Sequence, residues 1–212
     1  MTDWAAHEAA AEALRRLNGA FSGFEADHEL LRAISNDAHE LAVRLERGRP
    51  RDKTTDMSDL NVITADHSEL PRTVAVGERF EFDPFSPCGG RLHPSALDLE
   101  LRRDGETSIV GTVTVDPMFQ GPPGRVHGGI VALILDEVMG SLNRATAQRA
   151  FTARLALDLR APAPVSAPLT FRAWLLEKRG RKITVAADGR TAESVVFVEA
   201  EALFVQSDLQ AQ

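Results

Sequence analysis

Apolar residues near the start of the chain recur with the period of a helix. Between Asp27 and Arg47 they are spaced by three and four positions, which predicts an amphipathic helix. The residues of this stripe are Leu31, Ile34, Ala38, Leu41 and Leu45. Residues 5–18 are rich in Ala, Glu, Leu and Arg and predict an earlier helix that ends near Asn18-Gly19. Residues 47–66 are polar and irregular, which is typical of a linker.

Beyond Pro71 the pattern changes to alternation of apolar and polar residues, which predicts strands. The expected strands are 96–102, 107–115, 153–159, 169–177, 182–187 and 194–205. Turns are predicted at Asp104-Gly105, Arg179-Gly180 and Asp188-Gly189. A single helix at 129–147 lies between the two sets of strands. We therefore expect an α+β fold in which an antiparallel sheet wraps around this helix, with a helical extension at 1–70 and the main domain at 71–207.

Composition excludes several classes of protein. With 24 Lys and Arg against 31 Asp and Glu, the formal charge is −7, which argues against a nucleic-acid binder. One cysteine, Cys88, permits no intrachain disulfide. The scattered histidines show no spacing typical of metal ligands, so no metal or other cofactor is expected. The run from Ile130 to Leu135 is too short to span a membrane, and no secretory signal is visible, which favours a cytoplasmic protein.

The central segment carries the chemical signal. Residues 121–129 read Gly-Pro-Pro-Gly-Arg-Val-His-Gly-Gly and lead directly into the predicted helix. Amides at a helix N-terminus are unpaired and carry partial positive charge, so they can stabilise a carbonyl oxygen that becomes negative. Two turns later Asp136 interrupts an otherwise apolar run. It shares a helical face with small or polar residues, namely Gly129, Ala132, Gly140 and Asn143.

This segment resembles the hot-dog acyl-CoA thioesterases, and most closely the small PaaI/THEM-type branch. The resemblance rests on the Gly-Pro-Pro-Gly-x-Val-His-Gly-Gly loop, on Asp136 nine residues after His127, and on Thr152 sixteen residues after Asp136. It covers about residues 75–206 and leaves the N-terminal 70 residues unmatched. It implies a hot-dog fold and the hydrolysis of an acyl-CoA to a free acid and coenzyme A, as in fatty acid metabolism.

The resemblance also implies roles for single residues. Asp136 would act as general base or nucleophile. The N–H of Gly129, with that of Gly128 as a second candidate, would donate to the thioester oxygen, and His127 would polarise the same carbonyl. Thr152 would position water from the partner subunit. Such sites form between subunits, so a homodimer or a dimer of dimers is expected. Contacts with the substrate are expected from Gly128, Val126, Asn143, Arg181 and Lys182. The last two belong to a basic turn and would reach the phosphates of coenzyme A.

Each of these residues also has a structural interpretation. Asp136 could be paired with an arginine, His127 could brace a loop, and the turn at Arg181 and Lys182 could be solvated. Cys88 is interpreted as a passive loop residue. On the same fold, the rival functions are a non-catalytic acyl-CoA-binding protein and an enoyl-thioester hydratase. The apolar stripe of the helix at 27–47 is expected to dock on the main domain, as a lid or as a structural brace.

Overall fold

The computed structural model describes residues 2–62 and 74–206. Two long helices open the chain, α1 (Trp4–Gly23) and α2 (His28–Glu46). The side chain of Asp27 caps α2 by accepting a hydrogen bond from the Leu30 N–H, as a helix N-terminus requires. Both predicted helices are confirmed, and α1 continues five residues beyond its expected end. The polar segment after α2 contains a further short helix, α3 (Lys53–Asp59), which the sequence pattern did not predict.

The rest of the described chain forms one sheet and one central helix. Seven strands lie in the order β1-β2-β3-β5-β6-β7-β4, and every neighbouring pair is antiparallel. The strands are β1 (Arg79–Phe80), β2 (Glu100–Gly105), β3 (Ser108–Thr114), β4 (Ala150–Leu159), β5 (Pro168–Arg179), β6 (Lys182–Thr191) and β7 (Val196–Gln206). A short 3₁₀ turn at Pro117–Phe119 precedes the central helix α4 (Gly128–Ala145).

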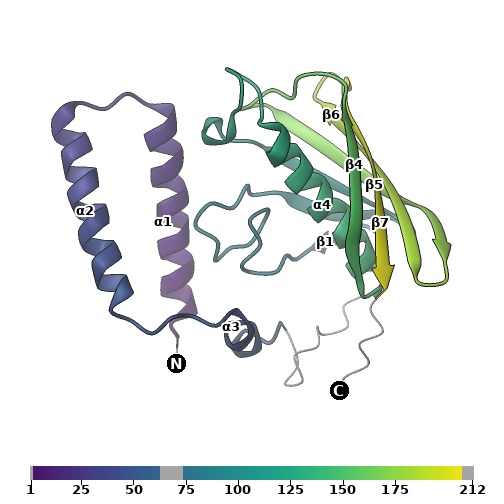
Figure 1. Ribbon diagram of the computed structural model, residues 1–212, viewed down its shortest axis with the longest axis horizontal. Coiled ribbons are helices and arrows are strands. Elements are labelled where there is room, and N and C mark those ends of the chain that lie inside the picture. The colour runs from purple at the N-terminus through teal and green to yellow at the C-terminus, as the bar shows by residue number, and fades with distance from the viewer. Residues whose placement is uncertain (1, 63–73, 207–212) are drawn as a thin grey trace. The chain divides into compact units, whose positions relative to one another are not determined.

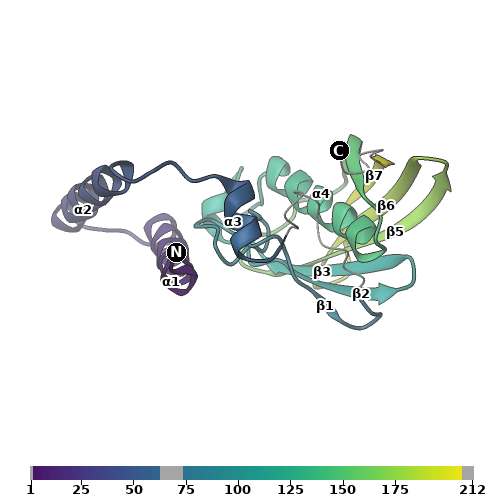
Figure 2. The same ribbon diagram turned by 90° about the horizontal axis from the view of Figure 1, so that it is seen from below.

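The sheet curves around α4, as Figures 1 and 2 show. The buried face of α4 includes Val131, Ile134, Leu135, Val138, Met139 and Leu142. These side chains pack against inward-facing strand residues such as Phe171, Ile183 and Phe204. This arrangement confirms the predicted hot-dog α+β fold. Because one face of α4 is buried on the sheet, the face that carries Asp136 is left for other contacts.

Three strand and turn predictions need correction. Asp188-Gly189 is no turn but lies inside β6, which bulges after Gly189. A Cβ at Gly189 would come within 2.6 Å of the Val198 side chain, so glycine is required there by close packing. The hairpin predicted at Asp104-Gly105 is present, but Asp104-Gly105 ends β2 and the turn itself lies at Glu106 and Thr107. The strand expected at 96–102 begins only at Glu100, because Asp98 adopts a left-handed backbone (φ 56°).

The first part of α1 packs on the same body as the sheet. Contacts group residues up to Gly19 with the sheet and α4, whereas the described residues 20–62 belong to a separate compact unit. The Arg15 guanidinium donates to the His93 carbonyl at 2.8 Å, Arg91 pairs with Glu8, and the Trp4 ring meets Phe85 edge-on. These contacts fix α1 to the loop that precedes β2. The predicted boundary between residues 70 and 71 lies outside the described residues.

No residue of α2 is buried. Its predicted docking on the main domain therefore stays a prediction. Among the described helices, none combines the length and the apolar character that crossing a bilayer requires.

Candidate active site

His127 caps the N-terminus of α4 with its side chain. Its backbone is extended (φ −62°, ψ 134°), and its Nδ1 accepts a hydrogen bond from the Gly129 N–H at 3.0 Å. An N–H donor requires a lone pair on Nδ1, so in the neutral ring the proton belongs on Nε2. The His127 side chain is exposed, and its Nε2–H is therefore available to a carbonyl oxygen.

The two glycines that open α4 differ in their hydrogen bonding. The Gly129 N–H, expected to hold the thioester oxygen, already donates to His127. The Ile130 N–H donates to the His127 carbonyl at 2.9 Å. Within the residues described by the structure, the Gly128 N–H has no acceptor. Of the two candidate donors, Gly128, as the first residue of the helix, thus offers the unpaired amide, whereas the Gly129 N–H is occupied.

Asp136 and Thr152 meet on the side of α4 that faces β4. The Thr152 hydroxyl donates to Asp136 Oδ1 at 2.8 Å. A β-bulge between Thr152 and Arg154 shifts the pairing of β4 with β7 at this point. Bulges of this kind re-aim a side chain and are common beside active sites. Asp136 is half-buried and Thr152 is exposed, so the pair is open to solvent at the edge of the sheet.

This contact corrects one expectation. Thr152 was assigned to the partner subunit, but its hydroxyl bonds to Asp136 of the same chain. The strand that carries Thr152 runs back alongside α4, from its C-terminal end toward its N-terminus, because β4 follows the helix directly. Both residues thus reach one site from a single chain.

The neighbouring carboxylate, Glu137, has a different environment. It accepts a hydrogen bond from Ser86 at 2.9 Å and forms an ion pair with Arg144, which lies two turns further along α4. The Arg144 guanidinium in turn lies 5.0 Å over the Phe80 ring. The arginine pairing considered for Asp136 therefore belongs to Glu137. Among the described residues, Thr152 is the one hydrogen-bond partner of the Asp136 carboxylate.

Two further candidates lie deeper in the fold. Val126 is part of the core, and its N–H donates to the Ala163 carbonyl at 2.8 Å. Asn143 is buried on α4, two turns beyond Asp136, and its Nδ2 has no partner among the described atoms. The Val126 side chain is apolar, and among the described residues no hydrogen bond joins the Asn143 amide nitrogen to Asp136 or Thr152. Both assignments as substrate contacts stay predictions.

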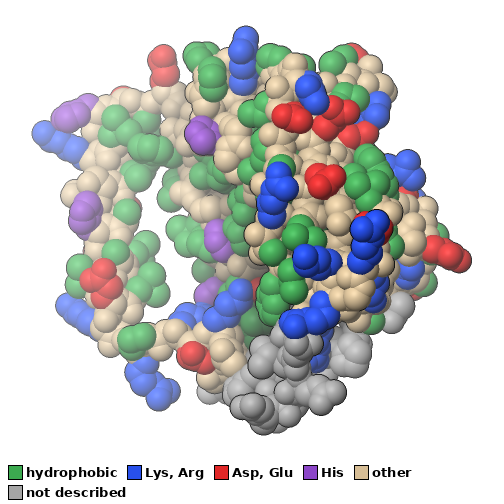
Figure 3. Space-filling model, turned by 45° about the vertical axis from the view of Figure 1, so that its right-hand side comes forward, with side chains coloured by type: hydrophobic (Ala, Val, Ile, Leu, Met, Phe, Trp, Pro, Cys, Tyr) green, Lys and Arg blue, Asp and Glu red, His purple; other side chains and the backbone are tan. Residues whose placement is uncertain are grey.

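The basic turn between β5 and β6 lies at the end of the sheet where β4 begins. The Arg181 guanidinium donates two hydrogen bonds to the Gln206 carbonyl, at 3.0 and 2.8 Å. Lys182 pairs with Val205 of β7, one row before the row of Thr152 and Phe204. Figure 3 shows a group of Lys and Arg side chains in the lower half of the face that it presents, below a group of Asp and Glu side chains. Both predicted cations are exposed, but the Arg181 guanidinium is hydrogen-bonded to the backbone.

Cys88 is buried beside α4, with its Sγ 3.7 Å from the Leu133 carbonyl. Burial raises the pKa of its thiol far above the usual range, and the negative charges of Glu137 and Asp136 raise it further. We expect the native protein to resist an aromatic disulfide reagent at about pH 8, because the thiolate is the reactive form. The same chain in denaturant should react fully. Rapid stoichiometric labelling of the native protein would contradict this assignment.

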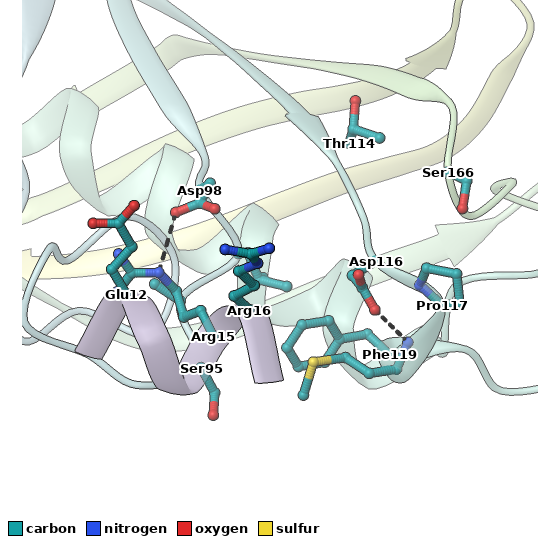
Figure 4. Close-up of a pocket in the computed structure, with 13 residues that line it drawn as sticks. Glu12, Arg15, Arg16, Ser95, Asp98, Thr114, Asp116, Pro117, Phe119 and Ser166 are labelled. Carbon is teal, nitrogen blue, oxygen red and sulfur yellow. Dashed lines mark hydrogen bonds and ion pairs between the residues drawn. The ribbon is translucent and has the colours of Figure 1, made fainter. Parts of the chain in front are cut away.

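A cavity of about 520 Å³ lies elsewhere, between α1 and the loops at the end of β3. Figure 4 shows Arg15 of α1 directed toward Asp98 in its wall, at 3.8 Å, and Asp116 beside the 3₁₀ turn. Its lining combines Glu12, Arg15 and Arg16 with Asp98 and Asp116. None of the predicted site residues lines this cavity. The candidate site, with Asp136 and Thr152, therefore lies outside this cavity, at the edge of the sheet formed by β4.

The geometry thus provides two chemical elements. One is a carboxylate oriented by a hydroxyl, at Asp136 and Thr152. The other is a helix N-terminus with one unpaired amide and an outward imidazole N–H, at Gly128 and His127. In the described part of the chain, no group of three or more His, Cys, Asp or Glu side chains is arranged to hold a metal ion.

Comparison with known proteins shows which family has a similar sequence in this region. The model of the thioesterase superfamily matches residues 123–198, which contain both chemical elements. Acyl-coenzyme A thioesterase THEM4 from Bos taurus is 31% identical over 93 residues, which are 43% of this chain and 38% of that protein. The Mus musculus protein of the same name is 33% identical over 91 residues, or 42% and 39%. The chain therefore matches about two fifths of the length of these relatives.

One solved structure extends the similarity to nearly the whole chain. The crystal structure of protein RHA08564, a thioesterase superfamily protein, is 30% identical with a TM-score of 0.74. The match covers 94% of this chain and 90% of that one. The E. coli PaaI protein from the phenylacetic acid degradation operon is similar in fold, with 14% identity and a TM-score of 0.50 over 52% of this chain and 84% of its own.

Proposed function

Because the chain belongs to the thioesterase superfamily, we propose that it hydrolyses an acyl-CoA thioester to the free acid and coenzyme A. The observation that carries this proposal is the Asp136 carboxylate. It lies on the central helix, is oriented by the Thr152 hydroxyl, and is not neutralised by the arginine that pairs with Glu137. A half-buried carboxylate without a cation beside it is suited to act on a substrate rather than to hold the fold together.

In the reaction, Asp136 accepts a proton from a water molecule while the water oxygen bonds to the thioester carbon. The carbonyl oxygen becomes negative and is stabilised by the Gly128 N–H and the His127 Nε2–H. The carbon–sulfur bond then breaks, and the coenzyme A thiolate takes up the proton. In the alternative route, an Asp136 oxygen bonds to the thioester carbon, and the carbon–sulfur bond breaks to release the coenzyme A thiolate. Water then hydrolyses the resulting anhydride, and the thiolate takes up the proton that is released. Both routes use the same two elements.

These two elements act on one carbonyl only if they come from different chains. Gly128 and Asp136 lie eight residues apart on one helix, which is a rise of about 12 Å. A carbonyl oxygen within hydrogen-bond distance of Gly128 would leave its carbon far from Asp136 of the same chain. We therefore propose a homodimer in which the start of α4 from one chain meets Asp136 and Thr152 of the other.

Two features of the chain suit this dimer. The face of α4 around Ala132 carries small residues, so two antiparallel α4 helices could cross there with Gly128 of one beside Asp136 of the other. In addition, β4 is a ten-residue edge strand that pairs only with β7 among the described strands. Its other edge is free to pair with β4 of a second copy. We place the phosphates of coenzyme A near Lys182, which lies one row from Thr152 in the sheet.

The direct test is release of free thiol from a panel of acyl-CoA esters of different chain length, with aromatic esters included. We expect turnover of at least one ester, and turnover of the same ester lowered at least about a hundredfold in the Asp136→Asn protein. Since Cys88 is buried, the native enzyme should add no thiol signal of its own. A protein that binds acyl-CoA tightly but releases no thiol would support the non-catalytic rival instead.

The shared site predicts complementation between inactive variants. Dimers are dissociated and reassembled from equal amounts of Asp136→Asn and His127→Ala chains. Half of the dimers then contain both variants, and each of these has one intact site, so about a quarter of the wild-type activity should return. The matched mixture of Asp136→Asn with Thr152→Ala should stay inactive, because those residues come from one chain. Equal recovery in both mixtures, or in neither, would exclude the proposed division of the site.

A further inference from the structure

The helix α2 carries an apolar seam that the described chain does not bury. Leu31, Ile34, Ala38, Leu41 and Leu45 follow each other at alternating spacings of three and four, the heptad pattern of a coiled-coil surface. Leu31 is 42% exposed, Leu41 52% and Leu45 79%. An exposed seam with this period fits another helix that presents the same spacing.

We propose that α2 pairs in an antiparallel seam with α2 of a second copy of this chain. In the register that centres the overlap between His39 and Glu40, Leu41 of each copy packs against Ala38 of the other. Ile34 then packs against Leu45 of the other copy. Each central layer combines a large with a small side chain, which lets the two helices approach closely. This register overlaps the helices from residue 33 to residue 46, which is fourteen of the nineteen residues of α2, and leaves Leu31 beyond the overlap.

The charges beside the seam favour this partner and this direction. Asp37 and Arg44 flank the seam on the same side, one heptad apart. In the antiparallel register each Asp37 lies beside Arg44 of the other copy, so two ion pairs form by symmetry. In a parallel pair Asp37 would instead lie beside Ala42, and neither charge would be matched. The sequence of α2 is thus complementary to itself in one orientation.

Cross-linking with single cysteines tests the contact. On the other flank of the seam, Ser35 of one copy lies beside Ala42 of the second. A mixture of Ser35→Cys and Ala42→Cys full-length chains, treated with a short bismaleimide, should yield a covalent dimer. Val43→Cys is the matched control, because Val43 is 48% exposed but lies on the opposite side of the helix. Cys88 is buried and should not interfere.

Substitutions test the seam and its charges separately. In the Ser35→Cys and Ala42→Cys background, Leu41→Lys should lower the yield of dimer at least about tenfold, because it buries an unpaired ammonium in the seam. Val43→Lys should leave the yield unchanged. Asp37→Arg and Arg44→Asp should each lower the yield, since each places like charges together, and the double variant should restore it.

The opposite outcomes overturn the proposal. Chains that stay monomeric in the cross-linking experiment would show that α2 does not pair with α2 of a second copy. A yield that is as high with Val43→Cys would show random collision. If the charge-reversed double variant failed to recover, the antiparallel register would be wrong. None of these outcomes depends on thioesterase activity, so the proposal fails or stands apart from the proposed function.

Discussion

Replacing Asp136 by Asn should lower kcat at least about a hundredfold while the protein stays folded. The carboxamide oxygen of Asn can still accept the Thr152 hydroxyl, which donates to Asp136 at 2.8 Å, so the local packing is kept. What is lost is the group that takes a proton from water or attacks the thioester carbon. The measurement is steady-state thiol release, together with a thermal melt of the same sample. Near-wild-type turnover in a folded Asp136→Asn protein would exclude the proposed role.

The adjacent carboxylate supplies the matched control. Glu137 accepts a hydrogen bond from Ser86 at 2.9 Å and forms an ion pair with the half-buried Arg144, so we expect it to stabilise the fold. Glu137→Gln should lower the free energy of unfolding by about 2 kcal/mol, because Arg144 loses its counter-charge in a partly buried position. Turnover of the folded Glu137→Gln protein should stay close to wild type. The two variants change neighbouring carboxylates to carboxamides. Asp136→Asn should lose turnover and keep its stability, whereas Glu137→Gln should lose stability and keep its turnover.

A single turnover in ¹⁸O-labelled water tests for a nucleophilic Asp136 whose anhydride is hydrolysed at the aspartyl carbon. If Asp136 activates water, the labelled oxygen enters the acid product in the first turnover. If Asp136 attacks the thioester carbon, and water then hydrolyses the anhydride at the Asp136 carboxyl carbon, the first product carries unlabelled oxygen from the side chain. The assay uses enzyme in excess over the ester, so that each site turns over once.

Replacing Gly128 by Pro should lower kcat about a hundredfold, the usual cost of removing one donor to a developing oxyanion. Proline has no N–H, yet it is favoured at the first position of a helix, where that N–H is unpaired. The extended backbone of His127 (ψ 134°) is also compatible with a following proline. The substitution thus removes the donor and leaves the start of α4 intact.

Gly128→Ala is the control for this change, because it adds a Cβ and keeps the N–H. That Cβ would lie 3.3 Å from Cδ1 of Leu159, the end of a flexible side chain that can shift slightly. The alanine variant should therefore retain activity within a factor of a few, as small surface adjustments do. If Gly128→Ala and Gly128→Pro lost activity equally, the loss would come from crowding at Leu159. In that case the amide would have no role in the reaction.

Local patterns in the sequence were sufficient for the elements that carry the site. The apolar run with Asp136 inside it predicted the central helix to within two residues at each end, because helical burial depends on a short repeat along the chain. The loop of glycines and prolines before His127 marked its N-terminus. Alternation predicted the later strands, although β2 starts later than expected. Asp136 itself stood out because a lone charge interrupts an apolar stretch.

Contacts between distant residues were decided by the tertiary structure. The partners of adjacent carboxylates could not be read from spacing: Arg144 neutralises Glu137, while Thr152 reaches Asp136 through a bulge in β4. The same holds for Asp188-Gly189, which reads as a turn but is held inside β6 by packing on Val198. Even the choice between Gly128 and Gly129 depended on the direction of one imidazole ring. Periodicity and turn chemistry act over a few residues, so the sequence alone determined the three long helices, most strands and the candidate carboxylate. Register, bulges and side-chain pairing depend on the whole sheet closing around α4, and only the folded chain decided which amide is free and which carboxylate is unpaired.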